Sequence, residues 1–296
     1  MRELFLTADA HLGRHEKAES ELQEVIDKGE KVIMGRNPLI IFGGDMVDSI
    51  SPNGLDDNTE IDKRLQGLER IIQETFLHDK QRLCVPGNHD VGYCSLSDKG
   101  INSKAIEIFE SNFNQVFWSF KEDRYVLVGL SSDLILNGGD SVSESINKKQ
   151  SEQTEFLKDT IRETKKNNQK VILFLHDPMA VRKVMDIIEW QTGNLEKVFC
   201  GHHHAQWTHS VYPVIQDLVK RPVIGKMIQK ILEQIIETDK VQPTLAYAQG
   251  IKRELSLWNT LQVTIIPAPG GMFGVGGGFL TAKIENEELS VKRYFV

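Results

Sequence analysis

Five short segments of this 296-residue sequence combine histidine, aspartate, asparagine and glycine, and together they contain six of its nine histidines. The segments are Asp9-Ala10-His11, Gly43-Gly44-Asp45-Met46-Val47-Asp48, Gly87-Asn88-His89-Asp90, His176-Asp177-Pro178 and Gly201-His202-His203-His204. Imidazole nitrogens, carboxylates and amide oxygens together favour manganese, iron or zinc over calcium or an all-oxygen magnesium site. For any one segment alone, an accidental surface cluster is the alternative. The set predicts a site for divalent metal ions, provided that the fold brings the segments together.

Each of these segments directly follows a short apolar run. We predict strands at residues 3–8, 38–42, 82–85, 125–130, 170–175 and 197–200. Several of these runs are too apolar to be exposed on either face, which is typical of parallel sheets covered by helices. In open α/β sheets, ligands bind outside the carboxyl ends of the strands. We therefore expect the polar segments to meet at one edge of such a sheet.

Helical patterns and a terminal hairpin complete the predicted elements. The clearest helices are expected at residues 61–76 and 151–164, and the second carries Glu152 and Glu155 in its first turn. Two β-patterned segments, 278–284 and 289–295, flank a polar turn at residues 285–288. Helices alternating with buried strands predict an α/β protein.

Composition limits the function classes. A hydrophobic content of 40% allows a full core, in one large domain or two smaller ones. The net charge of −7 provides no overall basic field for nucleic acid, although a local basic patch at a cleft stays open. Cys84, Cys94 and Cys200 form no CxxC pair, so we expect reduced thiols. Without a signal-peptide pattern or a run of membrane-spanning length, we expect a cytoplasmic protein that does not bind membranes.

In chain order, the motifs D-x-H, GD-x-x-D, GNHD, H-x-P and GH-x-H resemble the calcineurin-like metallophosphoesterase superfamily at every signature position. The resemblance extends over residues 9–204, and the C-terminal hairpin is also similar to the ending of that family. It implies a four-layer α/β sandwich in which two mixed β-sheets are flanked by helices. We expect a single domain over residues 1–296, with a helical insertion at about 214–240.

The resemblance also implies a centre of two divalent ions, manganese, iron or zinc. One ion would bind Asp9, His11, Asp45 and His204, and the other would bind Asp45, Asn88, His176 and His202. Asp45 would bridge, because a carboxylate can bind one ion through each oxygen, which suits ions about 3.5–4 Å apart. In an extended stretch, the His203 side chain alternates in direction with its two neighbours. We therefore expect His203 in the cleft or at the surface, and not as a ligand.

A catalytic mechanism follows from the same resemblance. Metal coordination lowers the pKa of water to about 7, so a metal-bound hydroxide is expected to attack the phosphoester. His89 matches the general acid of the family, which protonates the leaving group, and Asp48 matches the aspartate that orients it. A turn or a helix cap is the alternative for Asp48. Asp90 is interpreted as structural.

Departures from the family patterns bear on the substrate. Protein phosphatases of the family have GD-x-VDRG, whereas Ser49 follows Asp48 here. The opening D-x-HLG is similar to repair nucleases and lipid-precursor pyrophosphatases, but the segments at 151–153, 176–178 and 199–202 are closer to the cyclic-nucleotide phosphodiesterase-like branch. We predict a small phosphodiester, such as a cyclic nucleotide, as substrate. The residues expected to contact it are Asn88, His89, Arg14 and His203. The alternatives are a phosphomonoesterase or protein phosphatase, a nuclease, and a metal-free scaffold.

Two further segments lie outside these motifs. Apolar residues recur at helical spacing over 222–238, with Pro222 at the expected helix start. Such an amphipathic helix could pack on the core, cap the cleft or form a homo-oligomer contact. The glycine-rich stretch 270–278 lacks the GK[ST] of a P-loop, and we interpret it as a flexible connection near the cleft.

Overall fold

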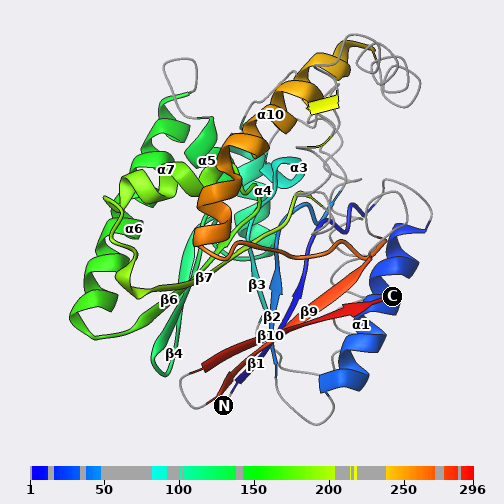
Figure 1. The fold of residues 1–296 in the computed structure, drawn as a ribbon, viewed down its shortest axis with the longest axis horizontal. Helices are drawn as coiled ribbons and strands as arrows, with labels where there is room; N and C mark the ends of the chain where they lie inside the picture. The colour runs from blue at the N-terminus through cyan, green and yellow to red at the C-terminus, as the bar shows by residue number, and fades with distance from the viewer. Residues whose placement is uncertain are drawn as a thin grey trace.

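The structure, a computed structural model, describes residues 2–12, 17–33, 38–47, 82–91, 101, 103–137, 143–203, 214, 217–218, 238–270, 277–285 and 288–296. Two five-stranded mixed sheets pack face to face, and helices cover their outer faces (Figure 1). This arrangement confirms the predicted fold class.

The first sheet has the strand order β10-β9-β1-β2-β3. Its strands are β1 (Arg2–Thr7), β2 (Leu39–Phe42), β3 (Arg82–Cys84), β9 (Gly278–Glu285) and β10 (Glu288–Phe295). The strands β1, β2 and β3 are parallel, and the hairpin of β9 and β10 joins β1 in antiparallel orientation. The helices on this side are α1 (Ala18–Ile33), the single turn α3 (Asn88–Val91) and α4 (Ser103–Asn112).

The second sheet has the strand order β4-β5-β6-β7-β8. Its strands are β4 (Trp118–Glu122), β5 (Tyr125–Gly129), β6 (Lys170–Leu175), β7 (Leu195–Cys200) and β8 (Thr264–Ile265). All neighbours are parallel except β4, which pairs with β5 in antiparallel orientation. The helices here are α5 (Ser132–Leu136), α6 (Glu144–Lys166), α7 (Ala180–Ile187) and α10 (Thr238–Thr260).

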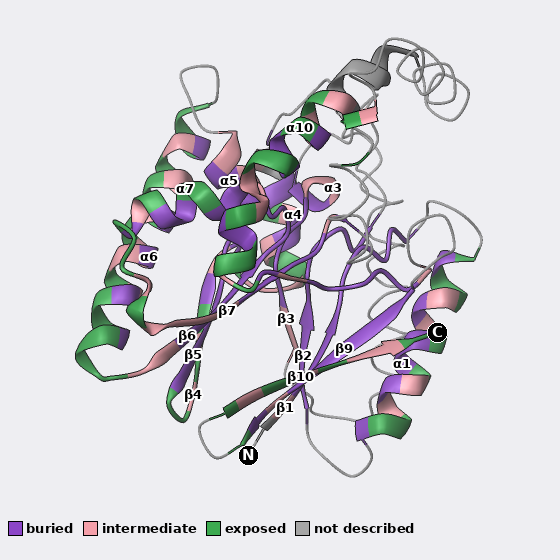
Figure 2. Ribbon diagram, viewed as in Figure 1, coloured by how far each residue is buried: buried purple, intermediate pink, exposed green. Residues whose placement is uncertain are grey.

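The alternation of side chains along each strand divides the core into three layers. In β1, Leu4 and Leu6 face the second sheet, whereas Phe5 packs with α1 on the opposite side. In β6, Phe174 faces the first sheet, whereas Leu173 packs toward the outer helices. A strand buried on both faces must be apolar at every position, which explains the continuous apolar runs. Figure 2 shows the strands mainly buried and the outer faces of α1 and α6 exposed.

The predicted strands agree with β1, β2, β3, β5, β6 and β7 to within two residues, and the hairpin is confirmed. The predicted helix at 151–164 is the later part of α6. The predicted helix at 61–76 and Cys94 lie outside the described residues, as does the predicted helix at 222–238 except for Thr238, where α10 begins. Of the glycine-rich stretch, residues 271–276 also lie outside them. Among the described residues, no helix is both long and apolar enough to cross a membrane.

Candidate metal centre

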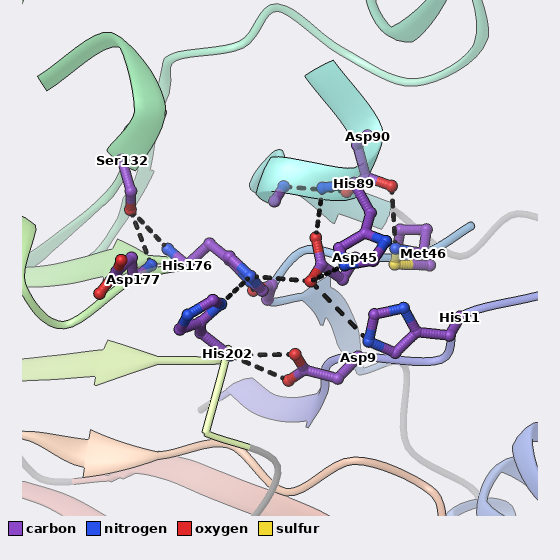
Figure 3. A network of polar contacts seen from close by, with 12 residues as sticks. Asp9, His11, Asp45, Met46, His89, Asp90, Ser132, His176, Asp177 and His202 are labelled. Atoms are coloured by element: carbon purple, nitrogen blue, oxygen red, sulfur yellow. Dashed lines mark hydrogen bonds and ion pairs between the residues drawn. The ribbon is translucent and has the colours of Figure 1, made fainter. Parts of the chain in front are cut away.

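The polar segments converge where the parallel strands of both sheets end. Six side chains from these segments point toward one another in Figure 3: Asp9, His11, Asp45, His89, His176 and His202. The segments after β1 and β2 stay paired beyond the strands, since the Asp9 N–H donates to the Gly44 carbonyl at 2.8 Å and the His11 N–H to the Asp45 carbonyl at 3.0 Å. The two sheets therefore supply one common site.

Asp45 lies at the centre of this cluster, with 2% of its side chain exposed. Its Oδ2 atom is 3.1 Å from Nε2 of His176, 3.8 Å from Nε2 of His11 and 3.9 Å from Nε2 of His89. Its Oδ1 atom accepts the backbone N–H of His89 at 2.9 Å. A single carboxylate is therefore within reach of three imidazoles that come from both sheets.

His176 is held in an orientation that suits metal binding. Its Nδ1 atom donates to the Gly43 carbonyl at 2.9 Å, so Nε2 is the ring nitrogen that faces Asp45. Burial opposes protonation of this imidazole, but Asp45 outweighs it and raises the His176 pKa to about 10, so a metal ion at Nε2 would take the place of a proton. Metal-binding histidines commonly donate their other ring N–H to a backbone carbonyl in this way. The Nε2 atom lies 3.2 Å from Nδ1 of His202. The ring thus presents a ligand atom to the cluster.

Two groups of ligand atoms can be distinguished in the described part of the chain, and they share Asp45. One group is His11, Asp45 and His89, the other is Asp45, His176 and His202, and within each group the ligand atoms lie within 4.8 Å of one another. Within the described residues, Oδ1 of Asn88 is a buried acceptor without a hydrogen-bond donor. A divalent cation would satisfy such an oxygen. The residues present therefore fit a centre of two metal ions.

The charges in the cluster also fit cations. Burial raises the pKa of Asp9 from its ordinary 3.8 to about 8. Burial also opposes ionisation of Asp45, but His176 and His89 outweigh it and hold the Asp45 pKa well below its usual range. Burial lowers the His202 pKa to about 4, so this imidazole is neutral, the form that binds metal. Burying the two negative charges of Asp9 and Asp45 costs free energy unless positive charge lies close by, and divalent cations would supply that charge to both carboxylates.

Several of these residues have unusual backbone conformations. Asp9, His11, Asp45 and His202 all have positive φ angles, of 55°, 45°, 51° and 64°. Residues other than glycine rarely adopt this left-handed region, and such strain concentrates at functional sites. The strained turns therefore direct these side chains into the cluster, and contacts elsewhere in the fold must stabilise them.

Asp90 holds two of the ligand segments together. Its Oδ1 atom accepts the backbone N–H groups of Met46 at 2.9 Å and Val47 at 3.3 Å, and its Oδ2 atom accepts that of Gly87 at 2.9 Å. The segment after β2 is thereby fixed to the segment after β3. This geometry agrees with a structural role for Asp90: its carboxylate places Asp45 next to His89.

Gly87 is required because Asp45 packs directly against it. A Cβ atom at this position would collide with Oδ1 and the backbone nitrogen of Asp45. We expect Gly87→Ala to displace this carboxylate and to weaken metal binding by about 10–100-fold, as measured by titration with manganese. Gly193→Ala is the matched control, since nothing lies within 4 Å of a Cβ there. Equal affinities of the two variants would show that the position of Asp45 does not matter for the metals.

The structure places the predicted site residues unequally. Arg14, Asp48 and His204 lie outside the described residues. Asn88 lies beside the cluster, and the predicted residues that the structure brings together are Asp9, His11, Asp45, His89, His176 and His202. His203 differs from the expectation of a cleft or surface position, because only 2% of it is exposed and its ring packs against Tyr247 and Trp258. Tyr247 was missed from the sequence, where no motif marks it.

Comparison with known proteins identifies the family of this chain. The profile described as calcineurin-like phosphoesterase matches residues 4–206, from β1 to beyond the histidine segment that follows β7. No curated protein matches the sequence significantly. Among solved structures, the 5'-nucleotidase precursor from Thermus thermophilus is similar, with 12% identity and a TM-score of 0.37; the match covers 69% of this chain and 42% of that one. Because the family profile covers more than half of the sequence, the chain belongs to the calcineurin-like phosphoesterases, a family of metal-dependent phosphoester hydrolases.

Proposed function

We propose that this calcineurin-like phosphoesterase hydrolyses a small phosphodiester, such as a cyclic nucleotide, with two divalent metal ions. The observation that carries the proposal is the pair of histidine and aspartate groups that share Asp45. Sharing one carboxylate keeps two ions close together, as two-metal hydrolysis requires.

The described residues divide into two proposed ligand sets. Asp9, His11 and Asp45 would hold one ion, and Asp45, Asn88, His176 and His202 would hold the other, with His204 as a further proposed ligand of the first. When bound, manganese, iron or zinc ions supply activation of water at neutral pH and stabilisation of charge on the phosphoryl oxygens. Hydrogen bonds hold these ligands in place. Asp90 accepts backbone N–H groups from two ligand segments, and the Gly43 carbonyl accepts from His176. The backbone N–H of His202 donates to both Asp9 oxygens, at 3.1 and 3.0 Å.

His89 is the proposed general acid. Its side chain is 17% exposed, whereas those of Asp45 and His176 are almost fully buried, so His89 lies where a substrate could reach it. Its backbone is fixed by the bond to Asp45, and its ring packs against that of His11 with the centroids 4.6 Å apart. A fixed imidazole at the open side of the cluster can donate a proton to a leaving alkoxide. Its nearness to Asp45 also permits a ligand role, which the kinetic test in the Discussion separates.

The substrate class rests on the sequence of the site. The arginine that follows the GD-x-VD motif in the protein phosphatases is Ser49 here, which removes one cationic contact for a phosphomonoester. The acidic net charge of −7 disfavours a long nucleic acid chain as substrate. A small diester places fewer negative charges in the site than either alternative.

A substrate panel tests this proposal. We expect the purified, manganese-loaded protein to hydrolyse cyclic nucleotides with a kcat/KM at least about tenfold above that for phosphomonoesters, dinucleotides and single-stranded DNA, a preference of about 1.4 kcal/mol. A preference for phosphomonoesters would favour a phosphatase. Cleavage of DNA, with retention on DNA at moderate salt, would favour a nuclease. Metal binding without any hydrolysis would overturn the proposed activity, and absence of both would favour a metal-free scaffold.

A further inference from the structure

The segments that carry His176 and His202 are joined by a tyrosine from a distant helix. Tyr247 lies on α10, which follows the proposed insertion and has no residue among the family motifs. We propose that Tyr247 is a positioning residue that fixes the relative placement of these two histidines and thereby sets the metal affinity of the centre. This inference rests on the proposed metal site.

The tyrosine hydroxyl makes two hydrogen bonds of defined direction. It donates to Oδ1 of Asp177 at 3.0 Å, and it lies 3.0 Å from Nε2 of His203. A tyrosine hydroxyl has one hydrogen, so Tyr247 accepts from His203, whose Nε2 must carry a hydrogen. The result is a continuous chain of hydrogen bonds, in which His203 donates to Tyr247 and Tyr247 donates to Asp177.

Both partners of Tyr247 are direct neighbours of proposed ligands. Asp177 follows His176 in the segment after β6, and His203 follows His202 in the segment after β7. Through the side chains of Asp177 and His203, the hydroxyl therefore links two segments whose imidazoles, His176 and His202, lie 5.0 Å apart between centroids. The Ser132 hydroxyl accepts the backbone N–H groups of His176 and Asp177, so loss of a Tyr247 hydrogen bond would free mainly the segment after β7.

Ring contacts add to the orientation. The Tyr247 ring meets the His202 ring edge-on, with centroids 5.6 Å apart and an interplanar angle of 72°. It meets His203 in the same manner at 5.7 Å, and Trp258 of the same helix also contacts that imidazole, with centroids 6.0 Å apart. Because rotation of the His202 ring would move it into Tyr247, α10 restricts the direction in which this ligand points.

The helix that carries Tyr247 lies beside α7 and contacts it (Figure 1). Gly250 lies so close to Met179 that a Cβ atom would come within 2.8 Å of its side chain. Arg182 donates to both oxygens of Glu254 at 2.9 and 2.8 Å. Asp177 is fixed independently of α10, since it accepts the Met179 N–H at 2.8 Å. Tyr247 thus connects Asp177 and α10 to the segment after β7, which carries His202.

Tyr247→Phe tests this role, because it keeps the ring and removes both hydrogen bonds. We expect this variant to bind manganese about 10–100-fold more weakly than the wild type in a calorimetric titration, the usual effect of losing a group that orients metal ligands. Tyr294→Phe is the matched control, since Tyr294 stacks on Phe279 in the first sheet, away from the site. It should bind manganese as the wild type does.

A second pair of variants tests the hydrogen bond from the histidine side. The His203→Gln side chain can still donate to Tyr247, so it should retain most of the affinity, whereas His203→Leu should lose about as much as Tyr247→Phe. Thermal unfolding of each metal-depleted variant identifies any loss of fold. Unchanged affinity in folded Tyr247→Phe, or equal losses in the glutamine and leucine variants, would overturn the positioning role. Failure of the wild type to bind metal would instead overturn the proposed function.

Discussion

Asp45→Asn is expected to leave the protein folded but unable to hold two metal ions, and to reduce phosphoester hydrolysis by about 10³-fold or more. The amide has no negative charge and only one oxygen for a cation. In the wild type, Oδ2 of Asp45 faces three imidazoles while Oδ1 accepts the His89 N–H, so both oxygens are engaged at the centre of the cluster. Because both ligand groups include Asp45, its loss should affect both ions.

Elemental analysis of the loaded and dialysed variant measures this loss directly. Asp159→Asn is the control, because Asp159 lies on the exposed face of α6 and pairs only with Arg162 among the contacts described for it. This control should retain the wild-type metal content and activity. If Asp45→Asn also retained both, the shared carboxylate would not be a ligand, and the two groups would have to bind metal independently of it.

His89→Ala is expected to retain both metals and yet to lose about 10²–10⁴-fold of the activity on an alkyl ester, whose alkoxide must be protonated as it leaves. An activated aryl ester should suffer much less, because a nitrophenolate leaves without a proton. The loss should therefore shrink as the pKa of the leaving group falls.

Steady-state kinetics on a series of esters, combined with metal analysis, separate the possible roles of His89. An equal loss on all esters with metals intact would indicate that His89 positions the phosphate and is not the acid. Loss of metal together with activity would indicate that His89 is a ligand in the group with His11 and Asp45. Only a loss that depends on the leaving group, at full metal content, agrees with a general acid.

The strands and the segments that follow them could be predicted because burial on both faces leaves a continuous apolar signal. The run at 170–175 coincides with β6, and His176 follows it directly. The edge strand β4 was not predicted, because its residues alternate between buried and exposed and include Ser119, Lys121 and Glu122. The two-residue strand β8 is too short for any periodic pattern.

The convergence of the polar segments could be predicted, but individual contacts between residues distant in sequence could not. The backbone conformations of Asp9, His11 and Asp45 depend on pairing between the segments after β1 and β2, which no single segment encodes. The buried place of His203 depends on Tyr247, more than forty residues further along the chain. The alternation of side chains predicted that His203 turns away from its neighbours, but not that a later helix would cover it.

Electron paramagnetic resonance of the protein loaded with two equivalents of manganese measures directly whether Asp45 bridges two ions. If Asp45 joins two ions at the separation of about 3.5–4 Å typical of two-metal hydrolysis, their spins are close enough to couple. We expect the spectrum of a coupled manganese pair. The six-line spectrum of isolated manganese, either free in solution or bound at separate sites, would contradict it.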